Sequence, residues 1–232
     1  MKKIVIIPGG FHPFHAGHLA LYNKAKENFP DAEVFVAATD DTSERPFSFD
    51  VKQQLAHIAG VKRGNFVKVK SPFKPTEITD KYDPNDTIVI YVKSEKNAKS
   101  GSDPEGPFPA EVDPKTGKLP LVTRGPNKGQ PISNWLQYYK SDKPLEPMTK
   151  HGYLAYLPTV EFGPGLKNAK DIRKLWPGLN DNRKLALIMS MYPITQKNRS
   201  MASKVAKIFD KVLIQPQPQQ PVSESLDYLP EK

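Results

Sequence analysis

Residues Ile4–Ile7 form a short, wholly apolar and β-branched run that ends at Pro8-Gly9-Gly10. Such a run is typical of a strand that is covered on both faces in a parallel sheet. The following stretch, from about Gly17 to Phe29, places Leu19, Tyr22 and Phe29 near one face at helical spacing. The chain therefore begins with a strand, a glycine turn and a helix, and we expect this strand to be the central one.

The same alternation continues along the chain. A helix is expected after Asp50, its predicted N-cap, with Gly60 at its end. Further strands are expected at Val34–Ala38, Phe66–Val69, Ile88–Val92 and Tyr153–Leu157, and further helices at Asp181–Tyr192 and around Met201–Val212. Alternating elements favour an α/β fold: a Rossmann-like open parallel sheet with helices on both faces.

Two segments break the pattern. Gly101–Pro131 holds seven Pro and five Gly in 31 residues, which excludes a continuous helix or a central strand. Gln215–Pro221 reads QPQPQQP, which favours an extended linker, and a short acidic tail follows it. We therefore predict one domain over 1–214 with a Pro/Gly-rich insertion at about 100–131, followed by a linker and tail over 215–232.

Composition limits the classes of function. The chain has 34 Lys and Arg against 25 Asp and Glu, a net charge of +9, so it should attract anions. It has no cysteine, which excludes disulfides, thiolate metal sites and cysteine nucleophiles. The apolar run at the amino terminus is far shorter than the roughly 20 residues of a membrane span. We expect a soluble protein of the cytoplasm, with no membrane partner.

The most informative stretch is Gly10-Phe11-His12-Pro13-Phe14-His15-Ala16-Gly17-His18, which follows the first strand and opens the first helix. Amides at a helix start lack internal partners, and the helix dipole adds positive potential, so a phosphate is favoured there. Gly10 and Gly17 let a nucleotide approach the backbone. His15 and His18 are three residues apart, so both rings can face one anion.

This stretch resembles the HxGH motif of the nucleotidylyltransferase superfamily, and its longer form is similar to that of archaeal-type nicotinamide-mononucleotide adenylyltransferases and phage cytidylyltransferase-like proteins. The resemblance implies that His15 and His18 contact the nucleotide phosphates in the transition state. It also implies that the glycine-turn backbone at Gly10 and Phe11, with Gly17, seats the triphosphate.

A second motif of that family has the form Ile-Ser-x-Thr-x-Ile-Arg at a helix start. Lys167–Arg173 resembles it: Ile172 and Arg173 match, while Asn168 and Lys170 stand at the Ser and Thr positions. The resemblance implies that Arg173 holds the leaving pyrophosphate and that Lys170 meets a phosphate. The resemblance covers about residues 1–95 and 150–195.

The predicted activity is the transfer of a nucleoside monophosphate, AMP in preference to CMP, from ATP or CTP to a small phosphomonoester, with release of pyrophosphate. The resemblance implies Mg²⁺, for which we predict no direct protein ligand. Because a phosphomonoester has a second pKa of about 6, it is already a nucleophile at pH 7 and needs no strong base. Positioning and charge stabilisation can then suffice.

A rival hypothesis is a nucleotide-binding or phage-associated assembly protein on the same fold, with weakened catalysis; a phage protein would act in the host cytoplasm. Nucleic acid is a less favoured partner, and self-association into a homo-oligomer is left open. Thr39 and Asp40 follow the second strand, where open α/β sheets bind ligands, so we assign them to the acceptor, against the equal alternative of a polar turn.

The remaining histidines and Trp176 are interpreted as structural. His57 sits in an amphipathic stretch and His151 beside a glycine, and neither is assigned to the site. A metal site at His12, His15 and His18 is the minor alternative to phosphate contact. Trp176 is interpreted as a packing aromatic at a helix end rather than a base-stacking residue.

Overall fold

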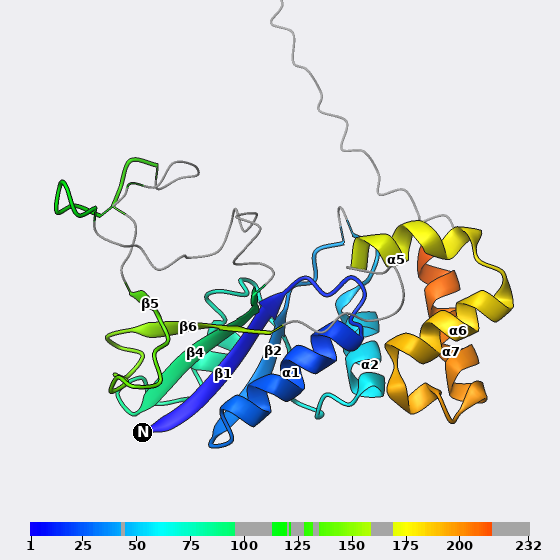
Figure 1. Ribbon diagram of the computed structural model, residues 1–232, viewed down its shortest axis with the longest axis horizontal. Helices are drawn as coiled ribbons and strands as arrows, with labels where there is room; N and C mark the ends of the chain where they lie inside the picture. The colour runs from blue at the N-terminus through cyan, green and yellow to red at the C-terminus, as the bar shows by residue number, and fades with distance from the viewer. Residues whose placement is uncertain are drawn as a thin grey trace, which may run out of the picture.

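The computed structural model describes residues 1–42, 45–95, 113–119, 121, 128–131, 135–158 and 169–214 (Figure 1). Its strands are β1 (Lys2–Gly9), β2 (Ala32–Ala38), β3 (Phe66–Lys68), β4 (Thr87–Ser94), β5 (Leu136–Tyr138) and β6 (Gly152–Leu157). Its helices are α1 (Ala16–Asn28), α2 (Phe49–Ala59), α3 (Thr76–Thr79), α5 (Ala169–Leu175), α6 (Asp181–Met191) and α7 (Arg199–Leu213), with 3₁₀ turns η1 (Trp176–Gly178) and η2 (Pro193–Thr195).

The six strands form one sheet in the order β3-β2-β1-β4-β6-β5, and every neighbouring pair is parallel. β1 lies inside the sheet, with Val5 level with Val34 of β2 and Ile90 of β4. All four side chains of Ile4–Ile7 are buried, as expected of a strand covered on both faces. The predicted parallel sheet with this strand at its centre is confirmed.

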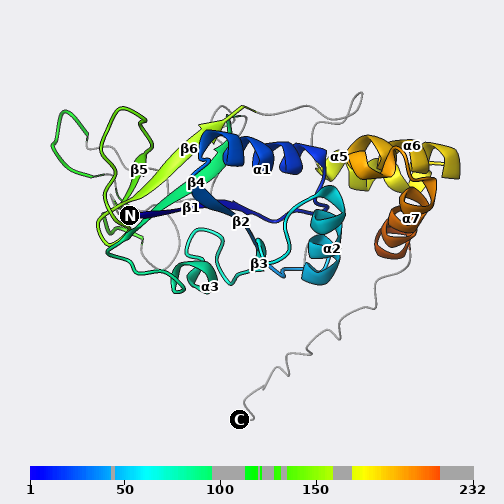
Figure 2. The same ribbon diagram turned by 90° about the horizontal axis from the view of Figure 1, so that it is seen from below.

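The two faces of the sheet are covered differently (Figure 2). Val5 and Ile7 point into the larger core, which contains side chains of α1, α2 and the carboxyl-terminal helices. Ile4 and Ile6 point into a smaller core that contains Ile78 of α3. The predicted α/β architecture with helices on both faces is confirmed, although the described helix on the second face has only four residues.

Two local features differ from the sequence-based expectation. The predicted fifth strand is β6, because the three-residue strand β5 precedes it and pairs Leu136 with Gly152 at the edge of the sheet. The N-cap of α2 is Ser48 rather than Asp50, and the amide of Phe49 donates to the Asp40 carboxylate instead of to a capping side chain. The helix ends at Gly60 with φ of 118°, as predicted, because that left-handed conformation favours glycine.

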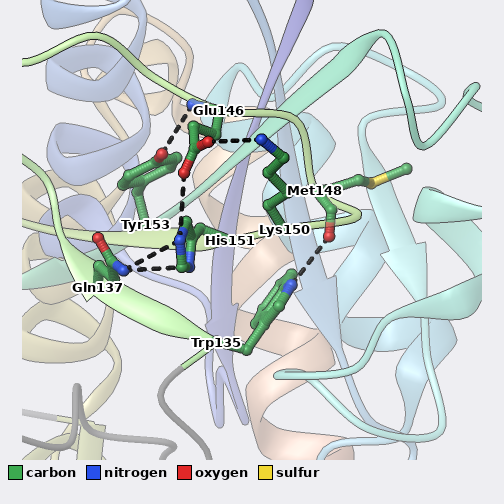
Figure 3. Close-up of polar contacts among 7 residues, drawn as sticks. All are labelled: Trp135, Gln137, Glu146, Met148, Lys150, His151 and Tyr153. Carbon is green, nitrogen blue, oxygen red and sulfur yellow. Dashed lines mark hydrogen bonds and ion pairs between the residues drawn. The ribbon is translucent and has the colours of Figure 1, made fainter.

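The segment before β6 is held by polar contacts among Trp135, Gln137, Glu146, Met148, Lys150, His151 and Tyr153 (Figure 3). The Trp135 indole donates to the Met148 carbonyl at 2.9 Å, and the amide of Glu146 donates to the Tyr153 hydroxyl at 2.8 Å. The Glu146 carboxylate lies 3.2 Å from Nε2 of His151. His151 thus takes part in anchoring the edge of the sheet, in line with its structural interpretation.

The carboxyl-terminal helices pack on the turn that follows β1. The Tyr192 hydroxyl donates to the Phe14 carbonyl, and the Phe209 ring lies 5.4 Å from the ring of Phe47. Trp176 is fully buried, 4.8 Å from the Phe209 ring, and its indole donates to Asp210. Trp176 is therefore a packing residue, as predicted, and this layer of helices is held against the HxGH turn.

The predicted domain limits stay a prediction. Within the insertion at 100–131 the structure describes residues 113–119, 121 and 128–131, where Leu121 and Pro131 form an antiparallel bridge. Residues 215–232 lie outside the described residues. None of the helices in the described part of the chain is long and apolar enough to span a bilayer.

Candidate active site

The HxGH turn joins the carboxyl end of β1 to the start of α1, and its two phenylalanines anchor it in the core. Phe11 and Phe14 are both buried, and their rings lie 5.8 and 5.9 Å from the ring of Phe66. The Phe11 ring also meets the His18 ring edge-on at 4.9 Å. Phe11 has a φ of 54°, which is uncommon for a residue with a side chain. The sequence predicted a role for the backbone of Phe11 only, whereas the structure shows that the Phe11 side chain also anchors the turn in the core.

His15 and His18 form a capping box at the start of α1. Nδ1 of His15 accepts from the amide of Gly17 at 3.1 Å, and Nδ1 of His18 accepts from the amide of His15 at 3.3 Å. The two rings stack at 3.7 Å with an angle of 25° between their planes. A ring nitrogen that accepts a hydrogen bond carries no proton, so in both neutral rings the proton resides on Nε2. The donor of each of the two stacked rings is therefore Nε2–H.

The capping box of His15 and His18 occupies amides at the start of α1 that we expected to be available to a phosphate. We expected free amides there, but the amides of His15 and Gly17 are engaged by the two imidazoles. The expectation of free amides is therefore wrong for these two residues, because each imidazole caps the helix with its inner nitrogen. The direct role of Gly17 toward a nucleotide stays a prediction.

Burial keeps both histidines neutral. It lowers the pKa of His18 to about 3, and burial followed by the neighbouring His18 lowers the pKa of His15 well below its usual value. At pH 7 the two rings are therefore hydrogen-bond donors without net charge. The two rings stack, as their three-residue spacing allows; their contact with a phosphate stays a prediction, and the positive charge of the site comes from other residues.

Arg173 supplies one of these charges. It lies on α5, and its Nη1 donates to the backbone carbonyl of His12, which joins two segments 161 residues apart. The structure thus brings the guanidinium predicted from the second motif against the HxGH turn. Lys170 lies one turn earlier on α5 and is exposed, while Lys167 and Asn168 fall outside the described residues.

Lys52 was not anticipated from the sequence. This α2 residue is fully buried, and its Nζ donates to the carbonyl of Thr39 and lies 3.3 Å from Nε2 of His12. Burial is the main cause that lowers the pKa of Lys52 to about 8. A lysine on an amphipathic helix usually points to solvent, so the sequence carried no signal for this position.

Arg45 is a second residue that the sequence did not single out. A Cβ on Gly10 would lie 2.5 Å from Nη1 of Arg45, so this glycine allows the guanidinium to rest against the turn. The predicted approach of a nucleotide to Gly10 stays a prediction, and in the structure the Arg45 guanidinium of the same chain lies against this glycine. The one feature of the sequence that could have indicated Arg45 is its position in the loop after β2, at the edge where open α/β sheets bind ligands.

The pKa of His12 shows that this region is strongly positive. Burial, then Lys52, Arg45 and Arg173 in that order, lowers its pKa to about 3. Three cationic side chains from three separate segments therefore surround one buried, neutral imidazole. Such a concentration of positive charge at the carboxyl edge of a parallel sheet is suited to bind a phosphorylated ligand.

Thr39 and Asp40 lie beside this cluster, and both have structural partners. The Thr39 carbonyl accepts from Lys52, and the Asp40 carboxylate accepts from the amide of Phe49 at 2.7 Å and pairs with Lys68. The hydrogen bond from Lys68 is the main cause that lowers the pKa of Asp40. Their assignment to the acceptor stays a prediction.

The described residues contain no group of three or more His, Asp or Glu side chains that could hold a metal ion. A cavity of about 350 Å³ lies apart from the turn, lined by Asn28, Phe29, Tyr138, Tyr139, Ser141 and Leu154–Leu157. It includes none of the predicted site residues, so the candidate site rests on the HxGH turn and its cationic neighbours.

Comparison with known proteins gives three findings. Residues 6–117 match the family described as Cytidylyltransferase-like. The phosphopantetheine adenylyltransferases of Lacticaseibacillus casei (strain BL23) and Lacticaseibacillus paracasei (strain ATCC 334) are each 38% identical over 78 residues. The match covers 34% of this chain and 44% of each relative, so the chain spans less than half the length of these relatives.

The third finding is a solved structure, a bifunctional NMN adenylyltransferase/ADP ribose pyrophosphatase from Francisella tularensis complexed with AMP and a manganese ion. It superposes with a TM-score of 0.42 at 14% sequence identity. The superposition covers 92% of this chain and 52% of that one.

Proposed function

We propose that this protein transfers a nucleoside monophosphate from a nucleoside triphosphate to a small phosphomonoester, since residues 6–117 match the family described as Cytidylyltransferase-like. The acceptor oxygen forms a bond to the α-phosphorus, the bond from that phosphorus to the bridging oxygen breaks, and pyrophosphate leaves with the electron pair. The acceptor phosphate is already ionised at pH 7, so no side chain has to remove a proton.

The stacked pair of His15 and His18 carries this proposal. In each ring Nδ1 accepts a hydrogen bond from a backbone amide and Nε2 carries the proton. The orientation of both rings is therefore fixed before any ligand binds. Donors that need no reorganisation are the most effective at stabilising charge that develops on a phosphate oxygen. The two rings contact the α-phosphate, and the helix start of α1 adds its dipole.

Arg173 holds the β- and γ-phosphates that leave as pyrophosphate. Its hydrogen bond to the His12 carbonyl orients the guanidinium toward the turn, and its planar fork suits two phosphate oxygens at once. Gly10, Phe11 and Gly17 shape the backbone beneath the triphosphate, and Lys170 on the exposed side of α5 adds a further charge.

Arg45 and Lys52 favour a phosphorylated acceptor. They lie on the β2–α2 side of the turn, whereas Arg173 reaches the turn from α5. Cations that reach one loop from two sides suit a reaction that brings two anionic substrates together. Thr39 and Asp40, next to Lys52, then contact the rest of the acceptor.

ATP is the preferred donor in this proposal, because two relatives are named adenylyltransferases. CTP is the second donor to test, since the matching family is described as Cytidylyltransferase-like. Mg²⁺ fits the site as an ion carried by the triphosphate, because the described residues hold no group of three or more side chains that could bind the ion directly. When bound, it neutralises charge on the phosphate oxygens.

The test measures pyrophosphate release with Mg²⁺, ATP or CTP, and a panel of phosphomonoesters that includes phosphopantetheine and nicotinamide mononucleotide. We expect His18→Ala to lower turnover at least about 100-fold, the usual scale for one preorganised donor. His18→Asn keeps an acceptor for the His15 amide but lacks the outward donor, so it should be equally slow. His151→Ala, at a histidine outside the turn, is the control and should keep wild-type turnover.

Two outcomes would contradict the proposal. A wild-type protein that binds ATP but releases no pyrophosphate with any acceptor would favour the nucleotide-binding protein on the same fold. Wild-type turnover of His18→Asn would show that His18 only caps α1.

A further inference from the structure

The positive charge of this protein is concentrated in its carboxyl-terminal helices. Residues 169–214 contain ten Lys and Arg but only three Asp and no Glu, so a segment of 46 residues carries +7 of the net charge of +9. Arg173 and Lys184 have roles inside the fold, through the His12 carbonyl and Asp210. Eight of the ten cationic side chains are exposed. The proposed reaction uses only Arg173 and Lys170 of this set, which leaves most of the charge without a role.

Helix α7 shows how this charge is arranged. Its apolar face is buried in the larger core, through Ala202, Val205, Ala206, Phe209 and Val212. On the opposite face Lys204, Lys207 and Lys211 are exposed at spacings of three and four residues, which places them in one row. We call these three residues the lysine row. It extends over about 10 Å along the helix axis.

The neighbouring acid does not neutralise the lysine row. Asp210, on the same helix, accepts from Lys184 at 2.7 Å and from the indole of Trp176 at 3.0 Å. In the part of the chain that the structure describes, none of the three lysines lies within ion-pair distance of a carboxylate. Like charges at these spacings repel, and a bound polyanion would relieve that repulsion.

We propose that the lysine row binds the phosphate backbone of duplex nucleic acid without reading its sequence. Duplex DNA carries one charge per about 1.7 Å of its axis, against one per about 3.4 Å along each strand. All three aromatic residues of 169–214, Trp176, Tyr192 and Phe209, are buried, so this surface has no ring on which an unpaired base could stack. The contacts are therefore with phosphates, and the duplex binds more tightly than the single strand.

An anionic membrane fits this surface less well. A basic helix that binds a bilayer also inserts its apolar face between the lipids. The apolar face of α7 is instead packed against Trp176 and Phe47 through Phe209, so only charge remains for the contact. With only charge available for the contact, the lysine row favours the partner with the higher linear density of negative charge, which is the duplex rather than the membrane.

The bound duplex lies on the outer side of a layer whose inner side touches the HxGH turn. On that inner side the Tyr192 hydroxyl donates to the Phe14 carbonyl. Helix α7 lies at the end of the molecule opposite β5 (Figures 1 and 2). The lysine row thus does not overlap with the residues of the proposed site. This inference does not depend on the proposed function, and turnover of small substrates should not need the lysine row.

The experiment measures fluorescence anisotropy of a labelled 20-base-pair DNA duplex with the full chain at 50 to 200 mM salt. The variant replaces Lys204, Lys207 and Lys211 with Gln, and the control replaces the exposed Lys81, Lys140 and Lys143 with Gln, an equal change of charge elsewhere. We expect the variant to bind at least about tenfold more weakly at 50 mM salt. Its slope of log affinity against log salt should be smaller by about 2 to 3, since each phosphate contact contributes about 0.9.

Four results would overturn the inference: no binding of the duplex by the wild type at 50 mM salt, equal losses for the variant and the control, tighter binding of the single strand, or binding only to anionic vesicles. Circular dichroism and pyrophosphate release, both at the wild-type level, verify that the triple variant is folded. If it does not fold, the three single substitutions are measured instead, and each should reduce the slope by about 0.9.

Discussion

Lys52→Met tests the most unusual feature of the candidate site, an ammonium group without solvent exposure. Lys52 is 0% exposed, and its partners are the Thr39 carbonyl and the ring of His12. Methionine has a similar length and no charge, so the substitution removes the ammonium and leaves the space filled. The expected effect is a change in how the stability of the fold depends on pH.

The magnitude follows from the pKa. The pKa of Lys52 is lowered from 10.5 to about 8, mainly by burial; Asp40 and Asp41 raise it, and Arg45 and Lys68 add to the lowering. This difference corresponds to about 3 kcal/mol. The unfolded chain binds this proton more tightly than the folded one, so the stability of the wild type rises as the pH increases from about 8 to 10.5. Below pH 8 the buried ammonium of Lys52 lowers the free energy of unfolding by this full amount.

The assay is urea unfolding of wild type and Lys52→Met at pH 7, 8, 9 and 10, with Lys81→Met as a control at an exposed lysine. The free energy of unfolding of the wild type, relative to that of Lys52→Met, should increase by about 2 to 3 kcal/mol between pH 7 and pH 10. Groups that titrate in both proteins cancel in this difference. A difference that stays constant with pH would refute a buried, protonated Lys52.

Two further predictions concern the reaction. Arg173→Ala should lower kcat/KM for the nucleoside triphosphate about 100-fold in the pyrophosphate assay, and Arg173→Lys should restore little of it because the planar fork is lost; unchanged kinetics would remove Arg173 from the site. The pH profile of kcat/KM should show an acid limb near the acceptor's own pKa of about 6 and an alkaline limb near 8, where Lys52 loses its proton. Burial lowers the pKa of His18 to about 3, so a limb near 6.5 that does not change with the acceptor would contradict a neutral pair.

Much of the fold could be predicted because its signals are local. The run Ile4–Ile7 has no polar side to place in water, so it had to become an inner strand of a parallel sheet. Gly60 closes α2 because its own backbone adopts the left-handed conformation. The strand β5 gave no such signal, because three residues acquire strand structure only by pairing with Gly152–Leu154.

The candidate site divides in the same way. The sequence itself determined the HxGH turn, the spacing of its two histidines and the presence of Arg173, since each is written in consecutive residues. Only the tertiary structure decided that the two rings are neutral donors, that Lys52 is buried and that Arg173 reaches His12. Burial and contacts across 161 residues depend on how whole elements pack, and the order of residues along one segment does not specify that packing.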